Sequence, residues 1–244
     1  MTAVRQHYEK LLADVYSWII GDFEAARQRN AELFARLGLQ AQPGDAAIDL
    51  GCGPGCQSIP LAETGFRVTA VDFCEPLLEE LRQHSGDLPI FPVRDDILNF
   101  ADCAPARAQV IVCMGDTLVH LPRHADVPLL LRSIVDRLEP GGVFIASLRD
   151  YSRPPPEGAA RFIPIRSDDQ RIFTCFLEYC GDIINVHDIL QVRDGGGWQL
   201  RVSCYRKLLL DYRRVAAVLR DAGMQVTEPF EFDGMMVVEA VKPA

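Results

Sequence analysis

The feature that most constrains this chain is a short apolar run that breaks into three closely spaced glycines. Residues 46–50 form the run, Gly51, Gly53 and Gly55 follow it, and helical periodicity begins at Ser58. Glycine adopts positive φ and lets the backbone come close to another group. The stretch therefore predicts a strand, a tight loop and a helix, with a ligand held against the loop.

The spacing of the glycines indicates the kind of ligand. A dinucleotide fingerprint would place its third small residue at Cys56, but here the third glycine comes one position earlier, and Pro54 removes an amide that could bind phosphate. A second apolar run, residues 66–71, ends in Asp72, where an acidic side chain can accept both hydroxyls of a ribose. An adenosine ligand without a pyrophosphate is therefore expected, which points to S-adenosylmethionine.

Residues 48–55 and the pair Val71 and Asp72 resemble the cofactor site of class I S-adenosylmethionine-dependent methyltransferases, and residues 139–142 add a Glu-Pro-Gly-Gly turn before a later strand. The resemblance covers residues 46–148. It implies a Rossmann-like, doubly wound α/β fold with a seven-stranded sheet whose last strand is antiparallel. It also implies S-adenosylmethionine as the cofactor, bound by Asp49, Gly51, Cys52, Gly53, Gly55, Asp72, Phe73, Asp96, Ile97, Cys113 and Met114.

Composition limits the classes of protein and partner that fit. A chain of 244 residues with 48% hydrophobic content can bury one substantial core, so we expect one domain over residues 1–244. Its 34 acidic and 25 basic residues give a net charge of −9, and no basic run exceeds two residues, so nucleic acid is not expected as a partner. No apolar run approaches the roughly twenty residues that span a bilayer.

The eight cysteines are scattered through apolar runs and lack the spacing of a disulfide framework or a zinc site. We therefore expect a cytoplasmic protein that binds no metal and no membrane. Its partner is expected to be a small-molecule methyl acceptor. The sequence leaves a monomer and a homo-oligomer both open.

Periodicity divides the chain into four parts. Two helical patterns separated at residues 21–22 come first, then helix and strand alternate, then four extended runs follow one another, and a helix and a hairpin across residues 233–234 close the chain. We expect the hairpin to join strands over 224–232 and 235–241. The four parts are predicted as a helical lid over 1–40, a cofactor-binding core over 41–149, an antiparallel insertion after the fifth strand over 150–207, and a closing helix and hairpin over 208–244.

Outside the cofactor motifs, the chain resembles glycine and sarcosine N-methyltransferases. The shared features are a Gly-x-x-x-x-His-Leu-Pro loop that contains His120, Arg149 just after the fifth strand, and an aromatic residue, Tyr205, before the last helix. The resemblance places these three residues and Asp116 around the reacting atoms. Asp116 stands where those enzymes carry an asparagine, and the insertion differs from theirs, so an amino-acid substrate does not follow from the likeness.

Three of the four catalytic candidates have an alternative role. Arg149, at the ligand end of a strand, can hold a carboxylate at two points or can pair with Asp150 or Asp116. His120 can act on a proton of the acceptor or can pack within a turn. Tyr205 can cap the site or can stack within its own sheet.

The expected chemistry asks little of side chains, because a sulfonium methyl group is already activated. The protein must hold a lone pair in line with the methyl carbon and exclude water. We predict methyl transfer to a small molecule, with an amine or amino-acid-like nitrogen as the acceptor. O-methylation of a small metabolite and a non-catalytic S-adenosylmethionine-binding role stay open, whereas the glycine spacing disfavours a nicotinamide-dependent oxidoreductase.

Overall fold

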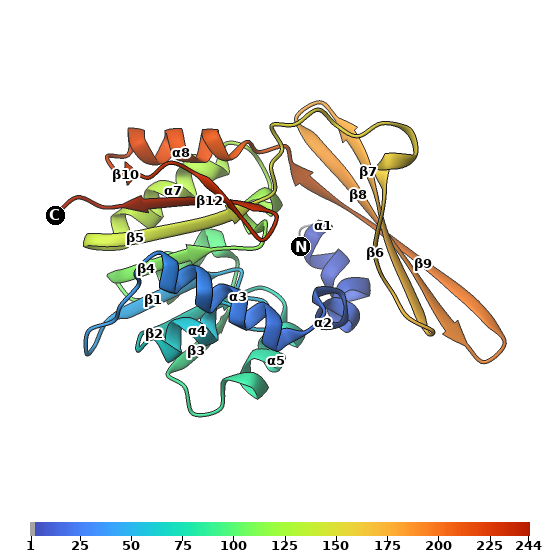
Figure 1. Cartoon of the computed structure of the whole chain (residues 1–244), viewed down its shortest axis with the longest axis horizontal. Helices are drawn as coiled ribbons and strands as arrows, with labels where there is room; N and C mark the ends of the chain where they lie inside the picture. Colours follow the sequence, from blue (N-terminus) through green and yellow to red (C-terminus); the bar gives the residue numbers. More distant parts are fainter. Residues whose placement is uncertain (1–2) are drawn as a thin grey trace.

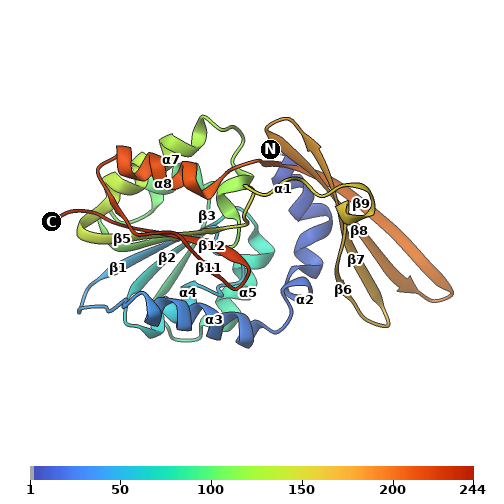
Figure 2. The same ribbon diagram turned by 45° about the horizontal axis from the view of Figure 1, so that its top comes forward.

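The computed structural model describes residues 3–244, so residues 1 and 2, which the sequence assigns to the helical lid, lie outside the described part. A large mixed sheet carries helices on both faces, and a separate antiparallel sheet stands at one end of it (Figure 1). Helices from the start of the chain lie between the two sheets (Figure 2). The predicted α/β architecture with a lid and an insertion is confirmed.

The large sheet has seven strands along its hydrogen-bonded path, in the order β10-β12-β5-β4-β1-β2-β3. β12 pairs antiparallel with β5 and β10, while β1 pairs in parallel with β2 on one side and β4 on the other. The chain order of the strands therefore reverses between β1 and β4, which is where open α/β sheets bind ligands. The strands are β1 (Ala46–Leu50), β2 (Arg67–Asp72), β3 (Ile90–Arg94), β4 (Ala108–Cys113), β5 (Leu138–Leu148), β10 (Gln225–Val226) and β12 (Met235–Val241).

The prediction of a single strand over residues 224–232 is wrong in one detail. It is split into β10 and a short eighth strand, β11 (Phe230–Phe232), and both pair with β12. Pro229 lies in the gap and has no N–H to donate to a strand ladder. The predicted hairpin across residues 233–234 survives as β11 and β12.

Two buried apolar clusters hold helices against the two faces of the large sheet. Alternate residues of each central strand enter opposite clusters: Ala47 joins one, and Ile48 joins the other. One face carries α3 (Phe23–Arg36), α4 (Ser58–Glu63) and α5 (Glu75–Ser85), and the other carries α6 (Phe100–Cys103), α7 (Asp126–Arg137) and α8 (Tyr212–Asp221). None of the helices in the described part of the chain has the length and apolar character needed to cross a bilayer.

The first predicted helix of the lid is irregular. It runs as α1 (Ala3–His7), a π-helical turn (Tyr8–Leu12), a 3-10 turn (Ala13–Val15) and α2 (Tyr16–Ile20). Gly21, with φ 95°, then ends it before α3.

The antiparallel sheet contains the four extended runs that the sequence predicted. Its order is β6-β7-β8-β9, with antiparallel pairing throughout. One face, here called the inner face, packs against the lid: Leu11 and Leu12 contact Phe173 and Leu190. The strands are β6 (Phe162–Ser167), β7 (Arg171–Cys180), β8 (Ile183–Asp194) and β9 (Gly197–Leu208).

Candidate active site

A cavity of about 300 Å³ lies at the carboxyl ends of the central strands, beneath the lid. It is here called the first cavity. The glycine turn, the loops after β2 and β3, the lid and the β11–β12 hairpin all contribute to its wall. Nine of the predicted site residues line it: Gly51, Cys52, Gly53, Asp72, Phe73, Asp96, Ile97, Met114 and His120.

Asp72 links the glycine turn to the end of β2 by hydrogen bonds. Its Oδ2 accepts the Gly53 amide at 2.9 Å and its Oδ1 accepts the Cys74 amide at 2.8 Å. Asp72 is 8% exposed as a whole residue, and burial raises the pKa of its carboxyl group, an effect that the two amide hydrogen bonds partly offset. Each carboxylate oxygen keeps a second lone pair, so the group can still accept a pair of hydroxyls from a ligand.

The glycines of the turn serve different purposes. Gly53 has φ 51°, and a methyl group built on it would point into open cavity space, with its nearest neighbour Tyr16 Cε1 at 3.7 Å. A methyl group on Gly55 would instead lie 2.3 Å from Leu81 Cδ1 of helix α5. Gly53 therefore leaves room for a ligand, whereas Gly55, which does not line the cavity, leaves room for a helix.

Asp49 and Cys113 also lie outside the lining of the first cavity. Asp49 is 1% exposed and accepts a hydrogen bond from the Ser58 hydroxyl at 2.6 Å, which ties β1 to the start of α4. Burial raises the pKa of Asp49 to about 7. Asp49 therefore stabilises the glycine turn without lining the first cavity.

The lid closes the first cavity with aromatic rings that were not among the predicted site residues. Tyr8 and Tyr16 both line it, and Tyr8 meets Phe73 edge to face with ring centroids 5.4 Å apart. Burial raises the pKa of both phenols, so they stay neutral. Helical spacing of aromatic residues was the only signal in the sequence, and such spacing is more typical of a core than of a ligand site.

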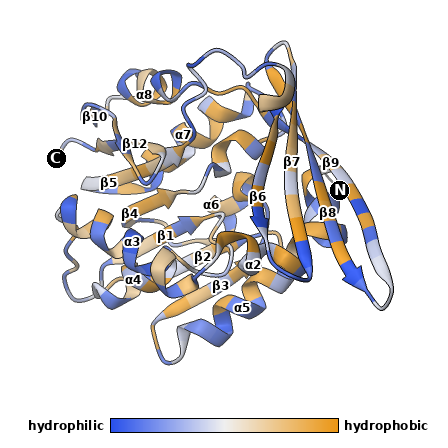
Figure 3. Cartoon of the chain, turned by 45° about the vertical axis from the view of Figure 1, so that its right-hand side comes forward, coloured by the Kyte–Doolittle hydropathy of each residue, from blue (hydrophilic) through white to orange (hydrophobic). Residues whose placement is uncertain are grey.

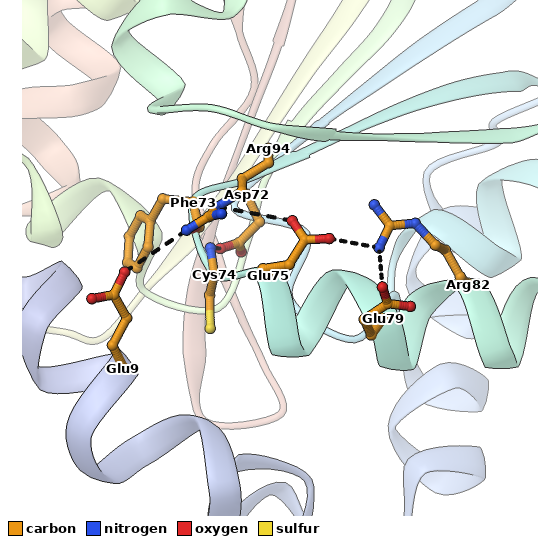
Figure 4. Close-up of polar contacts among 8 residues, drawn as sticks. All are labelled: Glu9, Asp72, Phe73, Cys74, Glu75, Glu79, Arg82 and Arg94. Carbon is orange, nitrogen blue, oxygen red and sulfur yellow. Dashed lines mark hydrogen bonds and ion pairs between the residues drawn. The ribbon is translucent and has the colours of Figure 1, made fainter.

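Arg94, at the end of β3, joins the lid to the loop that follows Asp72 (Figure 4). Its Nε donates to the Phe73 carbonyl at 3.4 Å, and its guanidinium lies 3.9 Å from Glu9 of the lid and 3.8 Å from Glu75 of α5. The side chain is 52% exposed, so these ion pairs add little stability. They do, however, bring three segments of the site together.

His120 lies in a stack of three rings that runs from the first cavity to the lid. Its ring packs on Tyr205 at 5.5 Å between centroids, and Tyr205 packs on His7 at 4.3 Å. His7 Nε2 in turn lies 2.8 Å from the buried Asp188 carboxylate of β8. Burial, with a contribution from the nearby Lys207 charge, lowers the pKa of His120 to about 3, so the imidazole is neutral at ordinary pH.

Asp116 forms a buried ion pair that was not predicted from the sequence. Its Oδ2 accepts the Lys207 ammonium at 2.8 Å and the Tyr151 hydroxyl at 2.7 Å, and its Oδ1 accepts the Arg149 amide at 3.1 Å. Burial alone would raise its pKa, but Lys207 and these hydrogen bonds hold the pKa below its usual range. Asp116 lines neither the first cavity nor its neighbour.

A second cavity of about 340 Å³ lies between the carboxyl end of β5 and the inner face of the antiparallel sheet. Arg149 and Tyr205 line it, and Met235 lines both cavities, so the two adjoin. The Arg149 side chain is exposed and has no hydrogen bond or ion pair to another side chain of residues 3–244. The opposite wall is apolar and consists of Ile163, Ile165, Leu177, Ile184 and Val186.

Residues 47–142 match the model of a methyltransferase domain family. These residues form a methyltransferase domain. The glycine turn, Asp72 and the first cavity all belong to that domain or border it. S-adenosylmethionine fits the residues present, because Gly53 leaves the space that a Cβ would fill and Asp72 offers free lone pairs to hydroxyls.

The relatives of this methyltransferase domain act on different acceptors. Glycine N-methyltransferase from Rattus norvegicus is 30% identical over 161 residues, which are 60% of this chain and 54% of that protein. Ubiquinone biosynthesis O-methyltransferase from Proteus mirabilis is 34% identical over 108 residues, 43% of this chain and 42% of that protein. The chain thus spans about half the length of these relatives or less.

Solved structures extend the likeness to the whole fold. The CcbJ methyltransferase from Streptomyces caelestis has a TM-score of 0.77 at 24% identity and covers 97% of this chain and 98% of its own. DesVI from Streptomyces venezuelae has a TM-score of 0.72 at 20% identity and covers 95% of this chain and 96% of its own. The lid and the antiparallel sheet are therefore shared parts of this methyltransferase architecture.

Replacing Asp72 with alanine is expected to weaken S-adenosylmethionine binding by about one to two orders of magnitude, because charge-assisted hydrogen bonds are worth roughly 1.5–3 kcal/mol. Isothermal titration calorimetry measures the change. Asp87→Ala is the matched control, since Asp87 is an exposed acid before β3. Unchanged affinity in Asp72→Ala, with the unfolding midpoint preserved, would overturn the assignment.

Proposed function

We propose that this protein transfers the methyl group of S-adenosylmethionine to a nitrogen of a small molecule that carries an anionic group, with Arg149 as the anchor of that anion. The observation that carries the proposal is the position of Arg149. Its guanidinium is unpaired among the described side chains and lies in the wall of a cavity that adjoins the cofactor cavity. A planar guanidinium is suited to two-point binding of a carboxylate or phosphate.

The size and wall of the second cavity favour an acceptor larger than glycine. About 340 Å³ with one apolar side can hold a ring or a short apolar chain as well as the anion. A nitrogen acceptor is supported by relatives named glycine N-methyltransferases. Other relatives are named O-methyltransferases, so a hydroxyl acceptor is the second candidate.

Bound S-adenosylmethionine supplies a methyl group activated by its sulfonium. We expect the aromatic residues of the lid that line the first cavity to exclude water from the reacting atoms. Because its pKa is about 3, His120 is a weak base but can accept a hydrogen bond from the acceptor's N–H or O–H as a neutral imidazole. The acceptor nitrogen must therefore lose its proton to solvent before transfer.

Product analysis tests the proposal directly. The protein is incubated with S-adenosylmethionine labelled in its methyl group and with amines that carry a carboxylate or phosphate, their neutral esters, and hydroxyl analogues of each. Labelled N-methyl product from the anionic amines is expected. Preferential labelling of the hydroxyl analogues would favour O-methylation, and calorimetric binding of S-adenosylmethionine without any product would favour a non-catalytic role.

The pH dependence of kcat/KM provides a second readout of the same proposal. A neutral His120 does not titrate above about pH 5, so the rise of kcat/KM with pH should follow the pKa of each acceptor's ammonium group. The rise should shift between acceptors of different basicity and persist in His120→Gln. A rise at one fixed pH that disappears in His120→Gln would instead identify His120 as the titrating base.

A further inference from the structure

Four rings from three segments of the chain contact one another in a closed set. His7 and Tyr8 belong to the lid, His120 ends the 3-10 turn that follows β4, and Tyr205 belongs to β9. His7 stacks on Tyr205 with ring centroids 4.3 Å apart, and Tyr205 stacks on His120 at 5.5 Å. Tyr8 closes the set, because it meets His120 at 6.4 Å and His7 at 6.1 Å, both edge to face. Each ring therefore contacts two others.

Three of these rings face a cavity and the fourth does not. Tyr8 and His120 line the first cavity, and Tyr205 lines the second. His7 lines neither cavity, and its side chain has no exposed surface. His7 can therefore act on the reacting atoms only through the other three rings.

A buried carboxylate of the antiparallel sheet fixes the orientation of the His7 ring. Asp188 of β8 is 2% exposed, and its Oδ2 lies 2.8 Å from His7 Nε2. Its Oδ1 accepts a hydrogen bond from the Cys175 thiol at 2.9 Å. A buried acid is costly unless its oxygens have partners. The pair between Asp188 and His7 therefore holds the imidazole in one orientation against the sheet.

Apolar contacts hold the same part of the lid against the sheet. Val4, in the same helix as His7, packs in one cluster with Ile184 and Tyr205. Figure 3 brings the antiparallel sheet forward and shows the start of the chain against β8 and β9, which carry hydrophobic stretches there. The first helix of the lid is thus attached to the sheet that lines the second cavity, while Tyr8, the next residue, lines the first cavity.

We propose that His7 and Asp188 are positioning residues for methyl transfer, which hold the rings where the two cavities adjoin so that donor and acceptor meet in line. The inference rests on the proposed function in placing the acceptor in the second cavity. In-line transfer is sensitive to position, and a displacement of about 1 Å can lower its rate about 100-fold. Apolar burial of a ligand is non-directional, so a small shift of the rings should change the affinity for either ligand little.

Four variants separate the His7 ring from its hydrogen bond. His7→Gln keeps a donor for Asp188 but removes the ring, whereas Asp188→Leu keeps the ring but removes its partner. Asp188→Asn keeps an acceptor for His7 and is the conservative variant. His124→Gln is the matched control, because His124 lies 3.5 Å from Asp182, an acid in the turn between β7 and β8, but lines neither cavity.

Single-turnover kinetics with the anionic amine that gives the most labelled product measure methyl transfer itself. His7→Gln and Asp188→Leu should each lower the limiting rate by about 10- to 100-fold. The half-saturating acceptor concentration and the dissociation constant of S-adenosylmethionine should change less than about threefold. Asp188→Asn and His124→Gln should keep the rate within about threefold of the wild type. Rates are divided by the number of cofactor sites that calorimetry finds, so that unfolded protein is not counted as slow protein.

Nuclear magnetic resonance tests the positions of the rings without any acceptor. The five histidines of the chain each give one signal when Cε1 carries ¹³C, and His120→Gln identifies the signal of His120. With S-adenosylmethionine bound, this signal should move in His7→Gln and Asp188→Leu and stay in place in Asp188→Asn and His124→Gln. A His120 signal that stays in place in Asp188→Leu overturns the inference.

Two kinetic outcomes also overturn the inference. One is an unchanged transfer rate in both His7→Gln and Asp188→Leu, and the other is a loss in Asp188→Asn as large as that in Asp188→Leu. If no amine is methylated, the proposed function fails by itself, and the His120 signal alone then decides whether His7 and Asp188 position the rings.

Discussion

Lys207→Met should lower the free energy of unfolding by roughly 3–5 kcal/mol, because removal of one partner of a buried ion pair leaves the other charge uncompensated. The side chains of Lys207 and Asp116 are only 14% and 4% exposed, and their charged atoms are 2.8 Å apart. Urea denaturation at neutral pH measures the loss. The double variant Asp116→Asn with Lys207→Met should recover most of it, since no charge then stays buried.

The exposed pair Arg213 and Asp211 is the matched control for this prediction. Its two side chains are 63% and 37% exposed and 3.6 Å apart, so Arg213→Met should cost less than about 1 kcal/mol. The assignment of Asp116 as a buried, charged partner of Lys207 fails if Lys207→Met costs as little as Arg213→Met. It also fails if the double variant is no more stable than Lys207→Met alone.

Replacing Arg149 with methionine should lower kcat/KM for an anionic acceptor by roughly 30-fold to a few thousand-fold. The bound acceptor would cover the exposed Arg149 side chain, and loss of one partner of a charge pair desolvated in this way costs roughly 2–5 kcal/mol. Arg149→Lys should lose more than about tenfold, since an ammonium cannot reproduce the two-point contact. S-adenosylmethionine affinity should stay the same in both variants. Steady-state kinetics and calorimetry with the anionic amines identified by product analysis measure the two effects.

Arg153 provides the control within the same cavity. It also lines the second cavity, but its guanidinium already pairs with Asp150 at 3.0 Å and lies 3.9 Å from Glu231. Arg153→Met should therefore change kcat/KM less than about threefold. If Arg149→Met is silent, or if neutral esters react as well as the acids, the anion does not bind at Arg149 and the acceptor must be sought among uncharged compounds.

The sequence could predict the glycine turn and its position beside Asp72, because both are built from local backbone features. Glycines at fixed positions after a strand, and an acid at the end of the next strand, determine the turn without help from distant residues. Gly53 and Asp72 accordingly meet through a single hydrogen bond of 2.9 Å at the wall of the first cavity. Gly55 belongs to the same pattern but packs against a helix, a difference that only the position of Leu81 reveals.

The acceptor half depends on contacts between residues that are distant in sequence. Asp116 departs from the asparagine of the resembling enzymes, and the extra charge is balanced by Lys207, which lies 91 positions later on β9. A lysine in an extended run gives no sign that it will be buried. Arg149 does contact Asp116, as one of the alternatives proposed. The contact is made by the Arg149 backbone amide, however, so the guanidinium stays in the second cavity.

The two cavities draw on two different sheets, and this separation affects how the protein can change over evolution. Side chains at the ends of the large sheet surround the first cavity, whereas most of the apolar wall of the second comes from β6, β7 and β8. Substitutions at Ile163, Leu177 or Val186 can alter the shape of the second cavity, which we propose as the acceptor site, while the glycine turn and Asp72 stay as they are. Under the proposed function, new acceptors can thus be acquired one strand residue at a time without loss of the methyl donor.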